Sequence, residues 1–223
     1  MKVYKLMFLL TIAILISCEK DSFDFNNNEC IDGSGMVVTE SRDLGNFHSI
    51  LNTVYADILI TQGPVEDIII EAQSNILEEL ETSVQNGQLI VETDRCIDID
   101  QAIKIFITIP EIRKLSLIGV GDFIAENEFN IDDLEVLISG SGNVSLKGEA
   151  TTLDITLTGV GDVRAYDMTV NICNVVITGV GNVEVFVNDK LDVTISGVGS
   201  VYYRGNPIVN STITGTGNVV NDN

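Results

Sequence analysis

The sequence predicts an all-β protein: a parallel β-helix, or β-solenoid, with coils of about 18–21 residues, preceded by a more irregular β-rich N-terminal half. Three observations predict it. A five-residue motif built on Gly-x-Gly recurs six times beyond residue 118. Apolar and polar residues alternate between the copies, as they do in strands with one buried face. Short runs rich in Ile and Val, separated by Gly or Asn, occupy residues 33–110.

The chain begins with a predicted export signal. Two lysines within residues 1–5 precede an almost wholly apolar run over residues 6–16, which is shorter than the ~20 residues that cross a bilayer. The segment Leu15-Ile-Ser-Cys18 then resembles a bacterial lipobox, in which the cysteine becomes the acylated first residue. We therefore expect a lipoprotein signal peptide over residues 1–17 and lipid attachment at Cys18. An ordinary signal peptide cut nearby, with Cys18 incidental, is the alternative.

The rest of the chain divides into a tether and one domain. Residues 18–30 are polar and turn-rich, which predicts a tether between lipid and fold. Residues 31–223 are expected to form a single solenoid domain, with irregular coils over 31–110 and regular repeats over 111–219. In the N-terminal part, strands are predicted at Met36–Ser41, Val54–Thr61, Asp67–Glu71, Gln88–Glu92 and Ile103–Ile109. Asn75, followed three residues later by Glu78, predicts one capped helical turn.

The mature chain is strongly acidic. Without Lys2 and Lys5 the basic count falls from 12 to 10 against 33 acidic residues, which gives a formal charge of −23. Such a surface repels nucleic acid and anionic lipid, so nucleic-acid binding is excluded. Solubility at a crowded surface explains the acidity better than cation binding does. A hydrophobic content of 45% is ample for a core and excludes disorder for the bulk of the chain.

The six repeats are interpreted as the corners of a stacked fold. They follow one another at intervals of 21, 19, 20, 18 and 18 residues. Glycines permit positive φ or close backbone approach, and the Asp, Asn or Ser that follows can hydrogen-bond local backbone. We expect two short strands and two bends per coil, with coils stacked ~4.8 Å apart. An antiparallel sandwich with glycine hairpins is the alternative, and the handedness is left open. The corner glycines are Gly119, Gly121, Gly140, Gly142, Gly159, Gly161, Gly179, Gly181, Gly197, Gly199, Gly215 and Gly217.

The Gly-x-Gly pairs do not predict a nucleotide or calcium site. A dinucleotide fingerprint needs a third glycine and a following helix, which are absent from the sequence pattern. Calcium-binding solenoids repeat every nine residues, and a calcium ladder requires carboxylates on successive coils. Here the position after the second glycine varies, and no cofactor or metal site is expected. Its occupants are Asp122, Asn143, Asp162, Asn182, Ser200 and Asn218.

An enzyme of β-helix type, a polysaccharide lyase or hydrolase, is the alternative function class. Glycosidase chemistry needs two carboxyl groups ~5–10 Å apart. Asp122 and Asp162, two coils apart, are expected ~10 Å from each other by the stacking repeat. However, other coils place Asn or Ser at this position, and the chain has no Trp to stack on a sugar. We therefore expect no catalytic residues.

Histidine and cysteine add little chemistry. His48 is the only histidine, and we expect a surface or packed residue rather than a base. Cys173 takes an inward position in its strand and reads as a small core hydrophobe. Three cysteines besides Cys18 cannot all pair within the chain; Cys30 and Cys96 are the candidate disulfide. No cysteines and histidines have zinc-ligand spacing.

The ordered set of motifs resembles the putative auto-transporter adhesin, head GIN domain family, which is common among Bacteroidetes lipoproteins. The resemblance covers residues 33–219 and implies a β-helix-like fold on a secreted or surface protein, with no catalytic motif to transfer. This chain departs from the repeat pattern at Ile118 and Ser200. The matching segments are Gly33-Ser-Gly-Met-Val, Leu44-Gly-Asn-Phe-His-Ser-Ile, Asp57-Ile-Leu-Ile-Thr-Gln-Gly, Asn75-Ile-Leu, Gly87-Gln-Leu-Ile-Val, the six [Ser/Thr]-Gly-x-Gly-[Asp/Asn/Ser]-Val copies and Tyr203-Arg-Gly-Asn-Pro.

Together these expectations describe a lipid-anchored cell-envelope protein that binds its partners without chemically changing them: a non-catalytic adhesion, binding or scaffolding module. Its partners are the membrane, through the N-terminal lipid, and a protein or glycan ligand that the sequence does not identify. We expect export to the bacterial outer membrane, facing either the periplasm or the exterior. The oligomeric state is left open.

Overall fold

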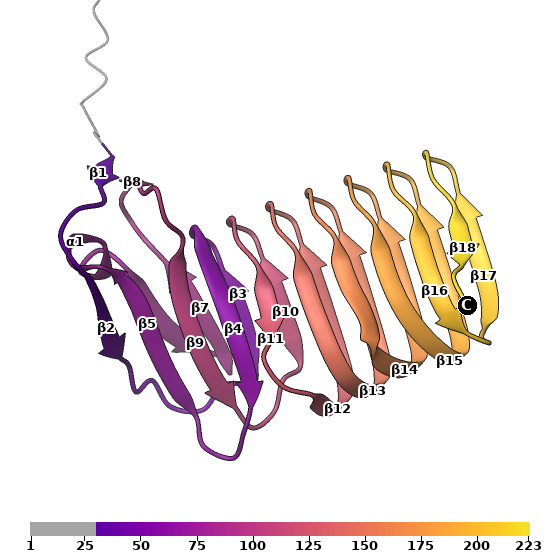
Figure 1. Cartoon of the computed structure of the whole chain (residues 1–223), viewed down its shortest axis with the longest axis horizontal. Coiled ribbons are helices and arrows are strands. Elements are labelled where there is room, and N and C mark those ends of the chain that lie inside the picture. The colour runs from indigo at the N-terminus through magenta and orange to yellow at the C-terminus, as the bar shows by residue number, and fades with distance from the viewer. Residues whose placement is uncertain (1–29) are drawn as a thin grey trace, which may run out of the picture.

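The computed structural model describes residues 30–223, so Cys18, the signal over residues 1–17 and the tether up to residue 29 lie outside the described residues. The described chain forms one long stack of strands that runs from the N-terminal end at the left of Figure 1 to the C-terminal end at the right. The regular coils pair in parallel throughout. The predicted parallel β-solenoid is therefore confirmed, and the antiparallel sandwich is wrong.

The regular coils begin after residue 113. Each coil contains one tight corner, at the upper edge of Figure 1, and one wider bend at the lower edge. We call the strand segments that lead into the corners the pre-corner face, and those that leave the corners the post-corner face. The strands are β10 (Lys114–Leu117), β11 (Phe123–Ala125), β12 (Phe129–Ile138), β13 (Val144–Leu157), β14 (Val163–Ile177), β15 (Val183–Ile195), β16 (Val201–Gly205), β17 (Ile208–Ile213) and β18 (Val219–Asn221).

The expectation of two short strands per coil is corrected by the lower bend. β13, β14 and β15 each run 13 to 15 residues and pass as single strands from one face to the other. Val144 at the start of β13 pairs with Val163, and Leu157 at its end pairs with Ile177. The strands on both sides of the bend stay paired with the neighbouring coils, because successive coils bend at equivalent positions.

The lower bend also absorbs the unequal repeat intervals. The register between β13 and β14 shifts at Ser145–Lys147, and that between β14 and β15 shifts between Ala165 and Ile172. The corners themselves stay in register, because the middle residue of every Gly-x-Gly motif bridges the next one in parallel. Extra residues are tolerated where the turn is wide and excluded where two glycines make it tight.

The N-terminal half contributes strands to the same stack, but out of chain order. β3 and β4 form a coil that lies between the pair β7 and β9 on one side and the pair β10 and β11 on the other. β2, β5 and β6 join antiparallel and cover the N-terminal end of the two faces. The bounds are β1 (Ile31–Asp32), β2 (Val37–Ser41), β3 (Ser49–Asn52), β4 (Ala56–Gln62), β5 (Asp67–Gln73), β6 (Glu81–Gln85), β7 (Gln88–Glu92), β8 (Ile97–Asp98) and β9 (Ile103–Ile109).

The predicted helical turn is present, but its cap is not. α1 spans Ser74–Leu77 and no side chain caps it. The side chain of Asn75 instead accepts from the N–H of Ser34 and donates to the carbonyl of Asp32, both at 2.8 Å. Asn75 therefore holds the arm that leads to β2, because these two backbone groups lie outside any ladder.

The core is the space between the two faces, filled by Ile, Val and Leu. Inward residues of successive coils lie directly over one another, as Leu153, Cys173 and Leu191 do on three adjacent strands. Each of these three side chains is fully buried. Burial of one such aliphatic side chain contributes about 1.5–3 kcal/mol, so the stack of coils, not any single coil, supplies the stability.

Candidate functional site

The corners are built from backbone contact between glycines of adjacent coils. A Cβ on Gly159 would overlap the carbonyl oxygen of Gly140, and one on Gly161 would overlap that of Gly142. Gly161 also has φ +151°, whereas its partner Gly159 is not in the positive-φ region. Both glycines of a pair are therefore needed for close approach, and the second also for its conformation. The same arrangement recurs at the pairs that begin with Gly119, Gly140, Gly179, Gly197 and Gly215.

The polar residue after each glycine pair links neighbouring coils, which corrects the expectation of a local bend contact. Asp122 Oδ1 accepts from the backbone N–H of Asn143 at 2.7 Å, and Asn143 Oδ1 accepts from that of Asp162 at 3.1 Å. Asp, Asn and Ser all serve, since only an acceptor oxygen is required. The remaining steps of this ladder run from Asp162 to Asn182, from Asn182 to Ser200 and from Ser200 to Asn218.

A seventh corner, without glycine, precedes the six in the stack. Tyr55 bridges Val120 as each motif's middle residue bridges the next, and Asp57 accepts from the N–H of Asp122 at 3.0 Å. The buried side chain of Asn52 makes this turn, because its amide donates to the carbonyl of Ala56 at 2.9 Å. Sequence reasoning missed this corner since it looked for glycine; the buried Asn at the end of a strand was the available signal.

The middle residues of the motifs form an exposed row along the corner edge. Val160, Val180 and Val198 are each about half exposed, at 54%, 48% and 52%. Beside them runs a second row, the residue before each first glycine, which is Ser or Thr in five of the six copies. These positions were read from the sequence as structural corners only. The structure places them on an open edge of the molecule.

A third row on the pre-corner face completes a continuous surface that we call the uncharged stripe. Its rows follow the strand register, so neighbours in a row are one coil apart. No residue of the stripe carries a charge, in a chain with 33 acidic and 12 basic residues. The rows are Leu137, Thr156, Val176, Thr194 and Thr212; Ile118, Ser139, Thr158, Thr178, Ser196 and Thr214; and Val120, Ser141, Val160, Val180, Val198 and Thr216.

The surfaces that flank the stripe are charged. Below it on the pre-corner face, Lys114 contacts Glu135 at 2.7 Å and Asn174 donates to Asp154 at 2.6 Å. One coil farther along the same row, hydrogen bonds from Lys190, and secondarily from Asn210, hold the pKa of Asp192 below its usual range. On the post-corner face the corresponding outward row contains Arg164, Glu184 and Tyr202. The stripe is therefore a bounded feature and not a sample of the whole surface.

The side chains of the stripe offer both hydrogen bonds and apolar contact. Ser and Thr hydroxyls each donate and accept a hydrogen bond, and the Val and Thr methyls supply apolar contact between them. Regular and without charge, the surface suits a neutral partner that approaches along the stack. An anionic partner would be repelled by the carboxylates of the pre-corner flank, Asp154 among them.

The carboxylates weighed for glycosidase chemistry are parts of the corner ladder. Asp122 and Asp162 are separated by Asn143, and each accepts a backbone N–H from the next coil. Neither lines any of the described hollows. The largest of these, about 730 Å³, lies at the lower edge between the β9–β10 connection and β12, and is lined by Glu111 and Asp133 among others.

His48 and Cys173 are both occupied by packing. His48 Nδ1 lies 3.0 Å from Ser49 Oγ, and Ser49 is only 7% exposed. The ring of His48 also covers Gly87, where a Cβ would meet it. Cys173 is fully buried, and burial raises the pKa of its thiol. Over residues 30–223 there is no group of three or more His, Cys, Asp or Glu placed to hold a metal ion.

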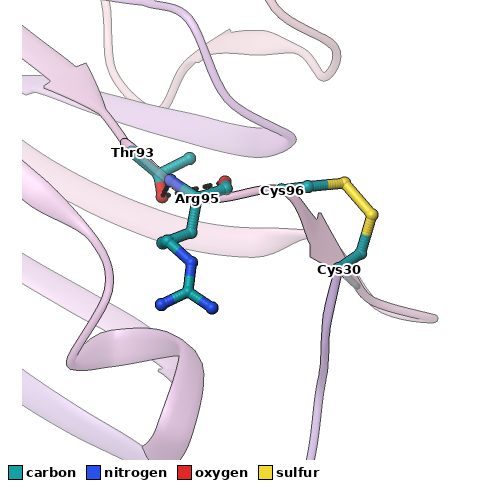
Figure 2. Close-up of a disulfide and its surroundings, with 4 residues drawn as sticks. All are labelled: Cys30, Thr93, Arg95 and Cys96. Carbon is teal, nitrogen blue, oxygen red and sulfur yellow. Dashed lines mark hydrogen bonds between the residues drawn. A yellow bond between two sulfur atoms is a disulfide. The ribbon is translucent and has the colours of Figure 1, made fainter. Parts of the chain in front are cut away.

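The cysteines expected to pair are joined in the structure. Cys30 and Cys96 form a disulfide that ties the start of the described chain to the loop before β8, as Figure 2 shows. In that loop Thr93 Oγ1 accepts from the N–H of Arg95 at 3.2 Å. β1 and β8 pair directly beyond the disulfide. The N-terminal arm is thus fixed to the end of the solenoid farthest from β18.

The fold and corner geometry agree with a family model that matches residues 46–207. That model describes the putative auto-transporter adhesin, head GIN domain. The chain belongs to this family. The match takes in the glycine-free corner at Tyr55 and five of the six glycine corners, so the GIN family pattern includes the part of the stack where chain order and spatial order differ.

Solved structures share the fold. A putative adhesin from Bacteroides fragilis is 24% identical, with a TM-score of 0.70, over 86% of this chain and 99% of that one. A putative lipid binding protein from Parabacteroides distasonis is 18% identical, with a TM-score of 0.54, over 86% of this chain and 100% of that one. No curated protein matches the chain. Among residues 30–223 of this GIN family member, no helix is long and apolar enough to cross a membrane.

Proposed function

We propose that this protein is a lipid-anchored adhesion module of the bacterial cell envelope, which binds a neutral protein or glycan through the uncharged stripe and performs no catalysis. The observation that carries the proposal is the stripe itself: three adjacent rows without one charged side chain on a protein of formal charge −21. The description of the family and of the Bacteroides fragilis neighbour, both of which name adhesion, support it.

The position of the N-terminal arm supports the proposed anchor. Cys18 is twelve residues before Cys30, and the disulfide fixes Cys30 at one end of the stack. Because such a tether would join the membrane to a terminal coil, the whole uncharged stripe would stay accessible in the anchored protein. Acylation at Cys18 by more than one chain supplies durable attachment, whereas one chain gives marginal binding.

The anchor is tested in cells. Cys18→Ser is expected to release the protein from the membrane fraction, and protease shaving of intact cells is expected to remove the wild-type protein. Retention of the Cys18→Ser protein in membranes would contradict lipid attachment. Survival of the wild-type protein during shaving would place it in the periplasm and contradict surface adhesion.

The binding surface is tested by charge. Thr178→Glu and Thr194→Glu together place two carboxylates at the centre of the stripe, while Ser145→Glu places one on the opposite face as a control. Adhesion of cells that display each variant is measured on immobilised neutral glycans and on matrix proteins. We expect at least a tenfold loss of adhesion for the stripe variant and none for the control. Equal adhesion of the wild type, the stripe variant and the control would contradict the stripe as the binding surface.

A further inference from the structure

The last coil has an open strand edge. β17 pairs only with β15, and β18 pairs only with β16, so within the described chain no strand lies on their outer sides. The N–H of Thr214 donates to the carbonyl of Ile195. Because backbone groups alternate along a strand, those of Val209, Ser211 and Ile213 then point away from β15. Such a row of free donors and acceptors is a template for another strand.

This edge lacks the charges that protect sheet edges. The final 19 residues, 205–223, contain a single charged side chain, Asp222, and Arg204 neutralises it at 3.4 Å. At the opposite end the edge strand β2 carries Glu40, paired with Arg42, and the edge strand β6 begins at Glu81. Protein sheets place charges on edges to prevent pairing. The unprotected end is thus also the least repulsive approach for a second acidic copy.

The sequence of β17 is nearly symmetric about Ser211. Apolar Val209 and Ile213 flank a polar centre, Asn210-Ser-Thr212. In an antiparallel pair of two β17 strands centred on Ser211, Val209 would lie opposite Ile213 of the second copy. Both residues face inward in register with buried Leu191 and Ile195, yet both keep exposed surface, Ile213 41% of its own. Pairing would therefore continue the core across the junction.

The second open strand fits the same arrangement. β18 runs opposite to β17 on the other face, and the corner apex at Thr216 lies between them. Ser211 is five residues before this apex and Val220 four residues after it. A single two-fold axis that relates two copies and runs perpendicular to both faces would therefore pass close to the centre of β17 and close to the centre of β18. The C-terminal coil of a second copy supplies two antiparallel partner strands at once, whereas a single extended peptide supplies one.

We propose that two copies of this chain pair end to end, β17 with β17 and β18 with β18, through an isologous two-fold interface. The two N-terminal arms then lie at opposite ends of the pair, because β1 of each copy is at the end of the stack away from β17 and β18 (Figure 1). The pre-corner faces of both copies lie on one side of the pair, whereas their corner edges point in opposite directions. The pairing itself does not depend on the adhesive function proposed above.

Sedimentation of the chain from Glu19 onward, which retains every described element, tests the pairing. The mass is expected to move from one copy to two as the protein concentration rises. Ser211→Lys, which puts an inward charge at the centre of the edge, is expected to weaken the dimer at least tenfold. Ser83→Lys adds a lysine to the outward side of edge strand β6 at the other end, where Ser83 pairs with Ile90, and is expected to leave the dimer intact. A monomer at all concentrations, or equal effects of the two variants, would overturn the proposal.

A cysteine at the symmetry centre tests the geometry. Directly opposed residues in an antiparallel hydrogen-bonded pair have Cα atoms about 5.5 Å apart, a separation that a disulfide spans. Ser211→Cys is expected to yield a covalent dimer under mild oxidation, while Ser83→Cys is not. Circular dichroism confirms that each variant is folded. A folded Ser211→Cys protein that dimerises without cross-linking would show pairing through another surface and would overturn the proposal.

Discussion

At the scale of the residue, the glycine motif does two jobs that its sequence does not distinguish. The first glycine of each pair is fixed by crowding alone and the second by crowding and by its backbone conformation, as Gly159 and Gly161 show. Sequence predicted that both mattered but could not separate the reasons, because contact with the next coil is a property of the stack. The middle residue is free of both constraints and carries surface chemistry.

Replacement of Gly161 by alanine should be far more damaging than a comparable change elsewhere. The added Cβ would overlap the carbonyl of Gly142 and also strain a φ of +151°, so we expect a loss of about 3 kcal/mol or more. Gly45→Ala is the matched control, because φ is +78° there but no atom lies within 4 Å of the added Cβ. Strain alone should cost about 1 kcal/mol at Gly45. Urea denaturation of both variants measures the difference, and equal losses would contradict the close-approach explanation.

The corner ladder predicts that charge is dispensable at Asp162 while an acceptor oxygen is not. Asp162→Ala removes the oxygen that accepts from the N–H of Asn182 at 2.8 Å, and we expect a loss of about 1 kcal/mol. Asp162→Asn keeps an acceptor, as Asn143 and Asn182 do in neighbouring coils, and should leave the free energy of unfolding nearly unchanged. If Asn proved as costly as Ala, the carboxylate charge and not the hydrogen bond would be the stabilising feature.

At the scale of the element, the sequence predicted strands more reliably than their partners. Gln88–Glu92 and Ile103–Ile109 were placed to the residue, because each is an Ile- and Val-rich run with clear ends. Their spatial order was beyond reach, since nothing local shows that the coil of β3 and β4 lies between β7 and β10. Two bends per coil were expected, but the continuation of β13, β14 and β15 through the lower bend was not, because no turn residue marks that bend in the sequence. The uncharged stripe was missed because it exists only when coils are in register.

The last coil is held by a side-chain clasp that should open in alkali. Tyr166 donates to Asp222 at 2.9 Å, and Arg204 lies over the Tyr166 ring at 4.0 Å. Burial, and then the hydrogen bond to Asp222, raise the pKa of Tyr166. A raised folded-state pKa means that the folded protein holds this proton more tightly, so stability is full below about pH 10 and falls as pH rises further.

Tyr166→Phe tests the clasp. It should lose about 1 kcal/mol at neutral pH, with the hydrogen bond to Asp222, and show a smaller decline in stability above about pH 10 than the wild type. Hydrogen exchange of the β18 amides, followed against pH, reports the opening of this coil specifically. Tyr202→Phe is the control, since this tyrosine lies outside the clasp. An unchanged alkaline decline in Tyr166→Phe would assign the decline to other groups.

The disulfide should stabilise the N-terminal arm. Cys30 and Cys96 are 66 residues apart, and closure of such a loop is worth at most about 4 kcal/mol through the unfolded chain. Cys30→Ser with Cys96→Ser should lower the thermal midpoint and increase hydrogen exchange in β1 and β8, while the C-terminal coils keep their protection. Cys173→Ser is a contrasting variant, because it leaves the disulfide in place and acts on the buried core. Loss of protection throughout the stack would contradict a local role for the disulfide.

At the scale of the whole molecule, the charged side chains are unevenly distributed over the surface. Acidic side chains occupy the flanks, Asp122 and Asp162 just after the corners among them, while the three rows of the uncharged stripe carry none. Net charge keeps the exported protein soluble and repels anionic surfaces, and the stripe leaves one long approach open to a neutral partner. Composition alone predicted the exclusion of nucleic acid. It did not predict where contact is permitted, because that depends on which residues the coils align.

The ionic-strength dependence of adhesion tests this account most directly. Contact through the uncharged stripe predicts that binding to a neutral ligand changes less than about twofold between low salt and ~1 M salt, where charge interactions are screened within about 3 Å. The Thr178→Glu and Thr194→Glu variant should stay weak at every salt concentration, because its added carboxylates must still be desolvated. A fall in wild-type binding of tenfold or more with salt would show that the charged flanks make the contact, and would contradict the stripe as the adhesive surface.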